Sequence, residues 1–426
     1  MNTLGSQTLA QKLIARAAGL PHVAVGDIVT CKVDLAMFHD SSGPRRLKPM
    51  LEELGAEIWD KSKVVLVMDH YVPEQDDDAR KIVRIARDWA RDQALPHVYD
   101  SLGICHVVLP QKGHLRPGML CVGGDSHSPT GGAFGAYMFG VGNTEMLGVV
   151  VTGEIWLRVP RTLQMQWNGQ LQRGVTAKDM MLHMTGQLGM NGGQYQAVEF
   201  TGRAVRALTM QERMTLCNMS AELGAQTGLV APDAVTRDYL LAAGVTAEAF
   251  TDMAHWQTDD DAQVEWTQWN ATTLAPQVAA PHSPANTASV DVHQGTVINV
   301  AYIGACTGAK LDDLRAAASI LRGQKVAQGV QLMVAPASLQ DQAAAQQDGT
   351  MQILRDAGAQ VFATSCGACA GYGGTVGEGS TVISSTARNF KGRMGAATAQ
   401  VYLASPYTVA ASALRGVITD PREVMA

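Results

Sequence analysis

Short apolar runs alternate with longer stretches of helical spacing along most of the chain. Residues 63–68 and 119–122 are apolar runs of strand length, whereas residues 77–94 and 209–223 place apolar side chains at helical intervals. Alternation of buried strands with helices is typical of α/β domains, in which helices cover a largely parallel sheet. The sequence therefore predicts an α/β fold.

Polar residues follow these predicted strands. Asp69-His70 comes directly after the first run and Asp125-Ser126-His127 shortly after the second, while His39-Asp40 and His106 are expected in loops or at strand ends. Sites of α/β proteins form at the carboxyl ends of strands. A carboxylate beside a histidine orients the imidazole and raises its basicity. Each pair alone could be a solvated turn, and adjacent residues cannot form a serine-hydrolase relay, but together they predict histidine–carboxylate chemistry.

Three cysteines are expected at the ends of two further strands. Cys306 follows the apolar run 296–300, and Cys366 and Cys369 follow the run 359–363. If these strands are near neighbours, three thiolates converge, and thiolates select soft metals and iron–sulfur clusters. A Cys-x-x-Cys pair also occurs in redox proteins and in half of a zinc site. A structural zinc site needs four ligands, and no further His or Cys lies close after Cys369, which favours a cluster.

Four more residues have chemistry of interest. Asn218 and Glu222 are four apart on a predicted helix and share a face, and a buried carboxylate such as Glu222 needs a partner or a metal. Arg388 and Arg393 could clamp carboxylates, or could form a solvated basic turn. An open metal with these groups fits Lewis-acid activation of a hydroxyl on a di- or tricarboxylic acid. Loss of water also needs a base, for which the sequence offers no compelling candidate.

The chain is too long for one core. Its 426 residues predict two to four domains. A middle region from about residue 160 to 269 carries helices such as 177–188. Residues 270–294, rich in Ala, Pro, Thr and Ser, are expected to form a linker. Residues 297–426 form the last region, which holds Cys306, Cys366 and Cys369.

Composition narrows the partners and the location. Hydrophobic residues at 46% and charged residues at 17% indicate a soluble globular protein, and a net charge of −6 gives no broad basic surface for nucleic acid or membrane. Seven cysteines do not indicate a disulfide framework. No apolar run approaches the ~20 residues of a membrane span. Residues 8–19 are expected to form a helix capped by Thr8 and Gly19, not a transit peptide. The expected location is the cytoplasm.

Several segments resemble the aconitase superfamily, in particular the large subunits of 3-isopropylmalate dehydratases. The resemblance runs over nearly the whole chain. Its most specific segments are Gly124-Asp125-Ser126-His127, Thr215-Leu216-Cys217-Asn218-Met219-Ser220-Ala221-Glu222, Cys366-Gly367-Ala368-Cys369 and Arg388-Asn389-Phe390-Lys391-Gly392-Arg393. Their occurrence together and in this order makes coincidence a poor explanation.

The resemblance implies an aconitase-like three-domain α/β/α core that lacks the swivel domain. The implied domains are an α/β domain over 1–160, a second α/β domain over 161–285 that ends in the linker, and a cluster-binding domain over 286–426. It also implies a [4Fe–4S] cluster held by Cys306, Cys366 and Cys369, with a fourth iron open to substrate.

The same resemblance assigns the polar residues to a substrate site. His70 would protonate the departing hydroxyl, with Asp69 or a neighbouring acid setting its charge. The implied catalytic residues are Asp69, His70, His106, Asp125, His127 and Glu222, and the implied substrate-binding residues are His39, Ser126, Asn218, Arg388 and Arg393.

The implied activity is that of a hydro-lyase that reversibly dehydrates a 2-hydroxy di- or tricarboxylic acid, most simply of the 3-isopropylmalate type. In one-chain aconitases the swivel domain supplies the serine base. This chain ends at Ala426 without that domain, so a separate small subunit is expected to complete the site.

Departures from the family pattern leave the substrate open. Gly308 and Ala387 stand where the family usually has asparagine, and Ser128-Pro129-Thr130 replaces a common Thr-x-Thr. Dimethylmalate, maleate and homoaconitate-type acids are therefore alternatives. Two other classes are an iron-sensing RNA-binding regulator, against which the absence of a basic tract counts, and an inactive scaffold that binds zinc at the cysteine pair.

Overall fold

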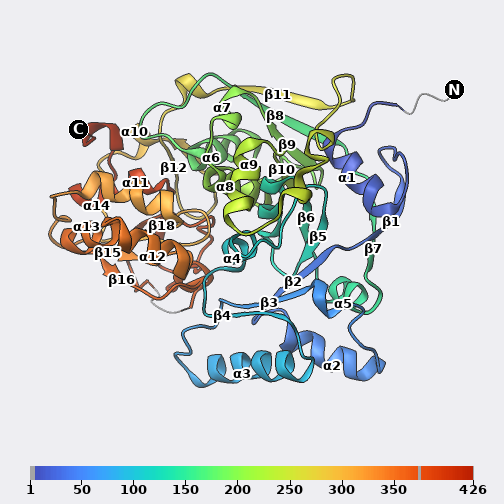
Figure 1. The fold of residues 1–426 in the computed structure, drawn as a ribbon. Coiled ribbons are helices and arrows are strands. Elements are labelled where there is room, and N and C mark those ends of the chain that lie inside the picture. The colour runs from blue at the N-terminus through green and yellow to red at the C-terminus, as the bar shows by residue number, and fades with distance from the viewer. Residues whose placement is uncertain (1–4, 373–375, 426) are drawn as a thin grey trace.

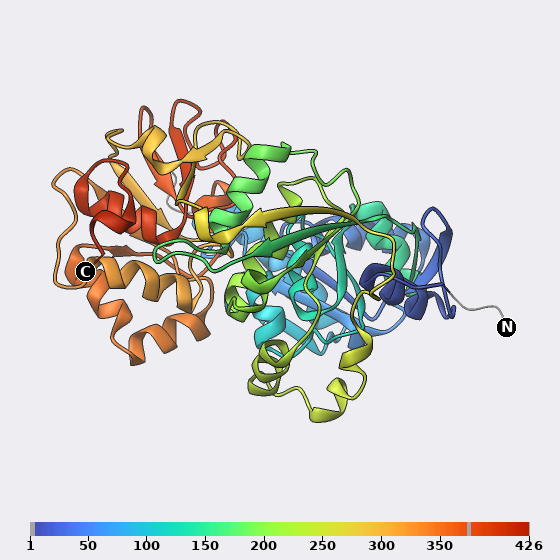
Figure 2. The same ribbon diagram turned by 90° about the horizontal axis from the view of Figure 1, so that it is seen from above.

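The computed structural model describes residues 5–372 and 376–425. Within these ranges it contains three largely parallel sheets covered by helices, together with one antiparallel ribbon. The expected α/β class is therefore confirmed. Residues after about 300 form a lobe on the left of Figure 1. Figure 2 shows this lobe, coloured orange to red, at the opposite end of the molecule from the blue N-terminal helix.

The first sheet has five strands in the order β4-β3-β2-β5-β6, and all neighbouring pairs are parallel. Every residue of β2 and β3 is buried, as expected for strands of a parallel sheet with both faces covered. The strands are β2 (Leu35–His39), β3 (Val64–Met68), β4 (His97–Asp100), β5 (Leu120–Gly123) and β6 (Tyr137–Gly140). The helices of this region are α2 (Pro44–Leu54), α3 (Asp77–Asp92), α4 (Cys105–Gln111) and α5 (Asn143–Thr152).

The second sheet has four parallel strands in the order β10-β9-β8-β11. Its strands are β8 (Thr162–Asn168), β9 (Ala197–Thr201), β10 (Thr227–Leu229) and β11 (Glu265–Asn270). The helices are α6 (Ala177–Leu188), α7 (Arg203–Arg206), α8 (Met210–Asn218) and α9 (Ala234–Ala242). Helix α8 packs against the 3₁₀ turn Ser128–Phe134 that follows Asp125, which brings the second sheet's helices to the site.

The third sheet has seven strands in the order β13-β12-β18-β17-β14-β15-β16, and the run from β18 to β16 is parallel. Its strands are β12 (Gln277–Ala279), β13 (Thr287–Ser289), β14 (Val300–Ile303), β15 (Gln331–Val334), β16 (Gln360–Val361), β17 (Thr381–Ser384) and β18 (Gln400–Ala404). Its helices are α10 (Val290–His293), α11 (Leu311–Leu321), α12 (Leu339–Gln347), α13 (Thr350–Ala357) and α14 (Pro406–Arg415).

The N-terminal helix α1 (Leu9–Ala18) has the ends that the sequence predicts. Thr8 Oγ1 accepts a hydrogen bond from the Gln11 backbone N–H, the Gln11 side chain accepts one from the Thr8 N–H, and Gly19 closes the helix at φ +68°. The helix packs against β1 (Ile28–Lys32), which pairs with β7 (Glu154–Arg158) in the antiparallel ribbon. The prediction of a capped helix is confirmed.

Residues 270–294 are not the linker that their composition suggests. They contain β12 and β13, which pair with each other, and β12 also pairs with β18 in the third sheet. Val278 and Ala279 are fully buried there. Small and β-branched side chains fit a buried strand of three residues, so a composition typical of linkers is not specific here.

Three other predicted elements differ in their bounds. The strand expected at 296–300 lies at Val300–Ile303, because residues 296–298 instead pair with the segment that follows α14. The strand expected at 359–363 is reduced to Gln360–Val361 at the sheet edge. The helix expected over 209–223 ends at Asn218 and continues as a 3₁₀ turn. Among the helices of the described residues, none combines the length and apolar character that crossing a bilayer requires.

Candidate active site

The candidate site lies at the carboxyl ends of β2, β3 and β5, which are neighbours in the first sheet. His39 is the last residue of β2, Asp69 directly follows β3, and Asp125 comes two residues after β5. Parallel strands deliver their carboxyl ends to one edge, so side chains that are 30 to 90 positions apart meet there. The predicted grouping of polar pairs at strand ends is what the structure shows.

His70 is held as an imidazolium by surrounding carboxylates. Its Nδ1 lies 2.7 Å from Asp69 Oδ1, and its Nε2 lies 3.8 Å from Asp125 Oδ2. Burial favours the neutral ring, but the charges of Asp69, Asp125 and Asp40 outweigh it and raise the pKa of His70 to about 10. His70 is therefore a proton donor at neutral pH.

His39 lies against His70 and carries the opposite protonation state. The two rings are stacked with centroids 4.0 Å apart. Burial and the charge of His70 lower the pKa of His39 to about 4, so His39 is neutral. Its Nε2 is 3.2 Å from the Gly124 carbonyl and 3.1 Å from Ser42 Oγ, whereas its buried Nδ1 has no partner among the described residues.

Asp69 joins the proton donor to the cysteine loop. Its Oδ2 accepts a hydrogen bond of 2.7 Å from the Cys105 backbone N–H, and its backbone carbonyl accepts one of 2.8 Å from the Cys366 N–H. Although burial opposes ionisation, the charge and hydrogen bond of His70 hold the pKa of Asp69 below its usual value. Asp69, whose carboxylate charges His70, is thus bonded through its backbone to the segment that carries Cys366.

Replacing Asp69 by asparagine is expected to shift the decrease of kcat at alkaline pH to a lower pH. The amide removes the largest charge that raises the pKa of His70, so His70 loses its proton in a window below pH 10. The charged pair also stabilises the fold below the unfolded pKa of histidine, ~6.5, and this contribution is lost as pH rises through about 10. A pH profile of kcat measures the shift.

Asp100→Asn is the matched control for this change. Asp100 ends β4, the neighbour of β3, and pairs with Arg87 instead of a site histidine. Its substitution should leave the alkaline limb in place. An unchanged limb in Asp69→Asn would mean that another group donates the proton.

Asp125 organises the second half of the cluster. Its Oδ1 lies 2.7 Å from His106 Nε2 and accepts a bond of 2.7 Å from the His127 backbone N–H. Burial alone would raise the pKa of Asp125, but the charges and hydrogen bonds of His106 and His127 hold it well below its usual range. Asp125 is therefore an anion that faces four histidines, since His39 and His70 also lie within 3.8 Å of its Oδ2.

A buried ion-pair chain continues from His127 into the cysteine lobe. His127 Nε2 lies 3.0 Å from Glu222 Oε1, and the same oxygen accepts a bond of 2.6 Å from Arg388 Nε. Arg388 Nη1 also donates to Ser126 Oγ at 3.0 Å. Burial opposes the charge on His127, but Glu222 raises its pKa to about 9. The second oxygen of Glu222 is buried without a partner among the described residues.

The three cysteines lie together although their strands are not adjacent. Strand β15 separates β14 from β16, so the loop after β16 returns toward the end of β14. The charge of Cys369 contributes to the pKa of both Cys306 and Cys366, and all three are free thiols. A hydrogen bond from Cys366 and the charge of Arg393 lower the pKa of Cys369 to about 6 against the effect of burial.

The surroundings of these thiols suit an anionic metal centre. Asn218 Nδ2 donates to Cys306 Sγ at 3.2 Å and to Thr130 Oγ1 at 2.8 Å. Arg393 Nε is buried and has no partner among the described residues. Three soft donors with an amide and arginine charges around them match the needs of an iron–sulfur site.

Two buried lysines that the sequence does not single out, Lys178 and Lys310, join the second sheet's helices to the lobe that carries the cysteines, Lys310 by a bond of 3.0 Å to Thr215 Oγ1 of α8. Lys178 of α6 donates to the carbonyls of Ser385 and Thr386 at 2.7 Å each. Lys310 donates to the Cys306 carbonyl at 2.9 Å and pairs with Asp313 at 2.8 Å. Burial lowers the pKa of Lys178 to about 8. Hydrophobic periodicity does not show that a lysine side chain points inward, so Lys178 and Lys310 cannot be identified from the sequence.

Replacing Lys178 by methionine is expected to lower the free energy of unfolding by about 1–3 kcal/mol, the cost of one buried group left without a hydrogen bond. Methionine preserves much of the apolar volume but leaves the Thr386 carbonyl without a donor, whereas the Ser385 carbonyl keeps the hydroxyl of Thr307 at 3.0 Å. Denaturant unfolding of the full chain measures this loss, and the partly exposed Lys48→Met serves as control. Wild-type stability in Lys178→Met would contradict a structural role of the ammonium.

Asp40 belongs to the predicted His39-Asp40 pair but is not among the implied catalytic or substrate-binding residues. Its carboxylate accepts backbone hydrogen bonds from His70 at 3.1 Å and Tyr71 at 2.8 Å. Burial and the charge of Asp69 raise the pKa of Asp40 to about 6. Asp40 directly follows β2, so it shares the strand-end position of the other polar residues of the site.

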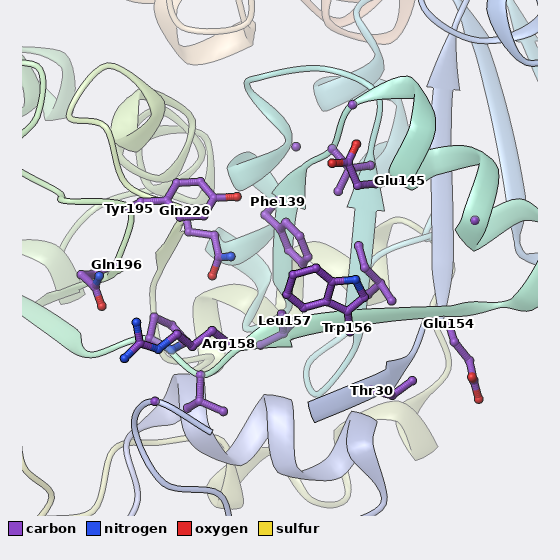
Figure 3. Close-up of a pocket in the computed structure, with 18 of the residues that line it drawn as sticks. Thr30, Phe139, Glu145, Glu154, Trp156, Leu157, Arg158, Tyr195, Gln196 and Gln226 are labelled. Atoms are coloured by element: carbon purple, nitrogen blue, oxygen red, sulfur yellow. The ribbon is translucent and has the colours of Figure 1, made fainter. Parts of the chain in front are cut away.

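A cavity of about 770 Å³ opens beside His70. Arg45, Tyr71 and Tyr372 line it, and the hydroxyls of the two tyrosines are 2.8 Å apart across the two lobes. A larger groove of about 1130 Å³ lies between the ribbon, β6 and residues 194–196. Figure 3 shows Trp156, Phe139 and Tyr195 around this groove. None of the described residues that line it is a histidine, cysteine or aspartate, so the groove is separate from the histidine–carboxylate cluster.

Comparisons with known proteins agree with this geometry. The family model described as Aconitase family (aconitate hydratase) matches residues 22–296 and 289–416. The 3-isopropylmalate dehydratase large subunit 1 of Methanopyrus kandleri is 43% identical over 420 residues, which cover 98% of this chain and 99% of the relative. A probable methanogen homoaconitase large subunit of Methanothermobacter thermautotrophicus is 39% identical and covers 97% of both chains.

A solved structure supports the fold. Thermococcus kodakaraensis aconitase X in its holo-form aligns with a TM-score of 0.50 at 13% identity and covers 84% of each chain. At this identity the likeness concerns the fold alone, and it is consistent with the aconitase-like core that the sequence predicts. The chain belongs to the aconitase family and is, as its sequence predicts, an enzyme of the hydro-lyase class.

Proposed function

We propose that this chain is the catalytic large subunit of an iron–sulfur hydro-lyase that acts on a 2-hydroxy di- or tricarboxylic acid, most simply one of the 3-isopropylmalate type. One observation carries the proposal. The His70 imidazolium is held by Asp69, whose backbone carbonyl bonds the Cys366 N–H at 2.8 Å. A proton donor and a three-thiol site are thereby joined in one structure.

Cys306, Cys366 and Cys369 would hold a [4Fe–4S] cluster. The fit rests on three free thiols, on the Asn218 amide at Cys306, and on arginine charges that lower the pKa of Cys369. Three ligands leave one iron without a cysteine, and when bound such a cluster supplies a Lewis acid there. The remaining tasks, which are substrate binding and proton transfer, would be carried out by protein side chains.

His70 would act as the general acid of dehydration. The bond between the substrate's carbon and its hydroxyl oxygen breaks, and the departing hydroxide takes the proton of His70 Nε2 and leaves as water. His70 Nδ1 keeps its bond to Asp69, which fixes the ring. The Asp125–His106 and His127–Glu222 pairs would hold that hydroxyl and its neighbouring carboxylate in place.

The substrate's carboxylates would meet donors that have capacity left. Arg393 Nε has no partner among the described residues. Arg388 would offer the substrate the same side of its guanidinium that donates a hydrogen bond to Ser126. Asn218 and the neutral His39 would add uncharged contacts, since the pKa of His39 is lowered to about 4 by burial and by His70. Negative charge that grows on a carboxylate during proton loss is stabilised by such preorganised donors.

A separate small subunit would bring the missing base and the swivel domain. This proposal is supported by relatives whose names contain "large subunit" and which match this chain over 97–99% of its length. In such a pair the base removes the proton beside the carboxylate while His70 protonates the hydroxide. A reducing compartment such as the cytoplasm is proposed for the chain, because free thiols persist there.

Anaerobic co-expression with a candidate small subunit tests the proposal. Iron and acid-labile sulfide are measured first, and then the absorbance of unsaturated acids is followed on 3-isopropylmalate, dimethylmalate, maleate and homoaconitate. We expect a cluster together with turnover of at least one acid. Cluster iron without turnover of any acid would contradict the proposed activity, and zinc without sulfide would contradict the cluster.

Homoaconitate-type acids are the second candidate substrates. The observation in their favour is the homoaconitase relative at 39% identity. Arg45 and Lys81 line the cavity beside His70 together with Val72 and Ile82, so both a carboxylated and an apolar substituent find partners there. The ratio of kcat/KM for the two acids separates the candidates.

A further inference from the structure

One buried tyrosine hydroxyl at the cysteine loops has no explained partner. Tyr302 lies in β14 and is 1% exposed, and its hydroxyl makes no hydrogen bond to any described residue. Buried phenol hydroxyls nearly always have a partner, because an unpaired one loses its bonds to water without replacement. An unpaired buried hydroxyl of this kind indicates a hydrogen-bond partner that is not part of the polypeptide.

The position of the ring is defined by two glycines. Tyr302 and Gly304 are two residues apart at the end of β14, and a Cβ on Gly304 would lie 2.2 Å from Tyr302 Cε1 and 2.5 Å from its hydroxyl oxygen. The ring therefore folds over Gly304 and needs glycine there. A Cβ on Gly367 would lie 3.7 Å from the same oxygen.

These glycines belong to the loops that carry the thiols. Gly304 precedes Cys306 by two residues, and Gly367 directly follows Cys366. The Tyr302 hydroxyl thus lies between the two cysteine segments, inside the lobe and away from solvent. Burial, together with the charges of Cys369 and Cys366, raises the pKa of Tyr302, so its hydroxyl keeps the proton and remains a donor.

We propose that the Tyr302 hydroxyl donates a hydrogen bond to a sulfur of the iron–sulfur cluster, either a sulfide or a ligating cysteine. Tyr302 is then a positioning residue, and the inference rests on the cluster of the proposed function. Hydrogen bonds to cluster sulfurs stabilise the more negative oxidation state and raise the reduction potential. They also hold the cluster against loss of iron.

A bound water is the competing explanation. A small cavity of about 70 Å³ is lined by Tyr302, Ser365 and Gly367, and a water there would satisfy the hydroxyl with or without a cluster. The two explanations differ in one respect. A bond to the cluster exists only in the loaded protein, whereas a bond to water exists in both forms.

The test compares Tyr302→Phe with wild type in the full chain, loaded anaerobically with iron and sulfide. The matched control is Tyr137→Phe, since Tyr137 is also fully buried but its hydroxyl bonds Gln226 and not a group at Cys306, Cys366 or Cys369. Iron and sulfide per chain, the reduction potential, the Fe–S vibrational bands in H₂O and D₂O, and the denaturant midpoints of apo and loaded forms are measured.

We expect Tyr302→Phe to bind the same iron and sulfide, with a lower reduction potential, a smaller D₂O shift of the Fe–S bands than in wild type because only the Asn218 donor remains, and severalfold faster loss of iron in air. Its denaturant midpoint should be equal to or above wild type in the apo form and below it in the loaded form. Tyr137→Phe should lose stability in both forms and keep the wild-type potential.

Two results would overturn the inference in distinguishable ways. If wild type loads its cluster but Tyr302→Phe keeps the same potential and vibrational shifts, the hydroxyl bonds something else and only this inference fails. If wild type takes up no sulfide-containing cluster at all, the proposed cluster and this bond fail together.

Discussion

Replacing Cys366 by serine is expected to remove most of the iron and sulfide and to reduce turnover by at least about 10³-fold. An alcohol has a far higher pKa than a thiol and is a harder donor, so it does not replace a thiolate on a soft metal centre. Iron and sulfide analysis of the anaerobically purified complex, followed by kcat on the best substrate, measures both effects.

The control for this change is Cys217→Ala. Cys217 is also a free, fully buried cysteine, but it lies on α8 and its thiol makes no hydrogen bond to any described residue of the site. Its substitution should retain the cluster at wild-type stoichiometry. Full activity of Cys366→Ser with a complete cluster would refute the ligand assignment.

Replacing His70 by glutamine is expected to lower kcat by about 10²–10⁴-fold, the usual contribution of a general acid. Glutamine keeps a hydrogen-bonding side chain but carries no transferable proton at neutral pH. The cluster content should not change, because no thiol ligand is touched. Steady-state kinetics with iron analysis on the same preparation separate loss of the acid from loss of metal.

His183→Gln provides the comparison, since His183 packs against Trp167 and Trp269 outside the site. This variant should keep kcat within about threefold of wild type. If His70→Gln also stays within that range, the departing hydroxide takes its proton from another group, and the elevated pKa of His70 serves structure alone.

The sequence predicts the local part of the site well. Asp69-His70 and Asp125-Ser126-His127 follow buried apolar runs, and parallel topology forces such ends together. The proposal of an iron–sulfur centre at the three cysteines rests on ligand softness and count. These inferences need only short-range pattern and general rules about sheets.

The sequence does not predict which partners meet across long separations. His106 reaches Asp125 across 19 positions, and Arg388 reaches Glu222 across 166. These pairs depend on how the lobes pack, which no local pattern encodes. Lys178 and Tyr302 are missed for a related reason, because the direction of a side chain is set by the cavity around it.

The strand bounds in the third sheet show the same limit. Residues 296–298 are as apolar as a strand requires. Their backbone nevertheless pairs with residues 416–418, and strand β14 begins only at Val300. The competing pairing partner lies more than a hundred residues away. The hydrophobic pattern therefore predicts the approximate position of the strand. It does not predict with which residues the strand pairs.

The backbone bond between Asp69 and Cys366 has a consequence for how the enzyme fails. A displacement of the segment around Cys366 would also move Asp69, the residue that charges His70. If the proposed cluster were lost and this segment moved, His70 would lose its ion-pair partner through the same movement. Loss of metal and loss of the proton donor are therefore expected to occur together.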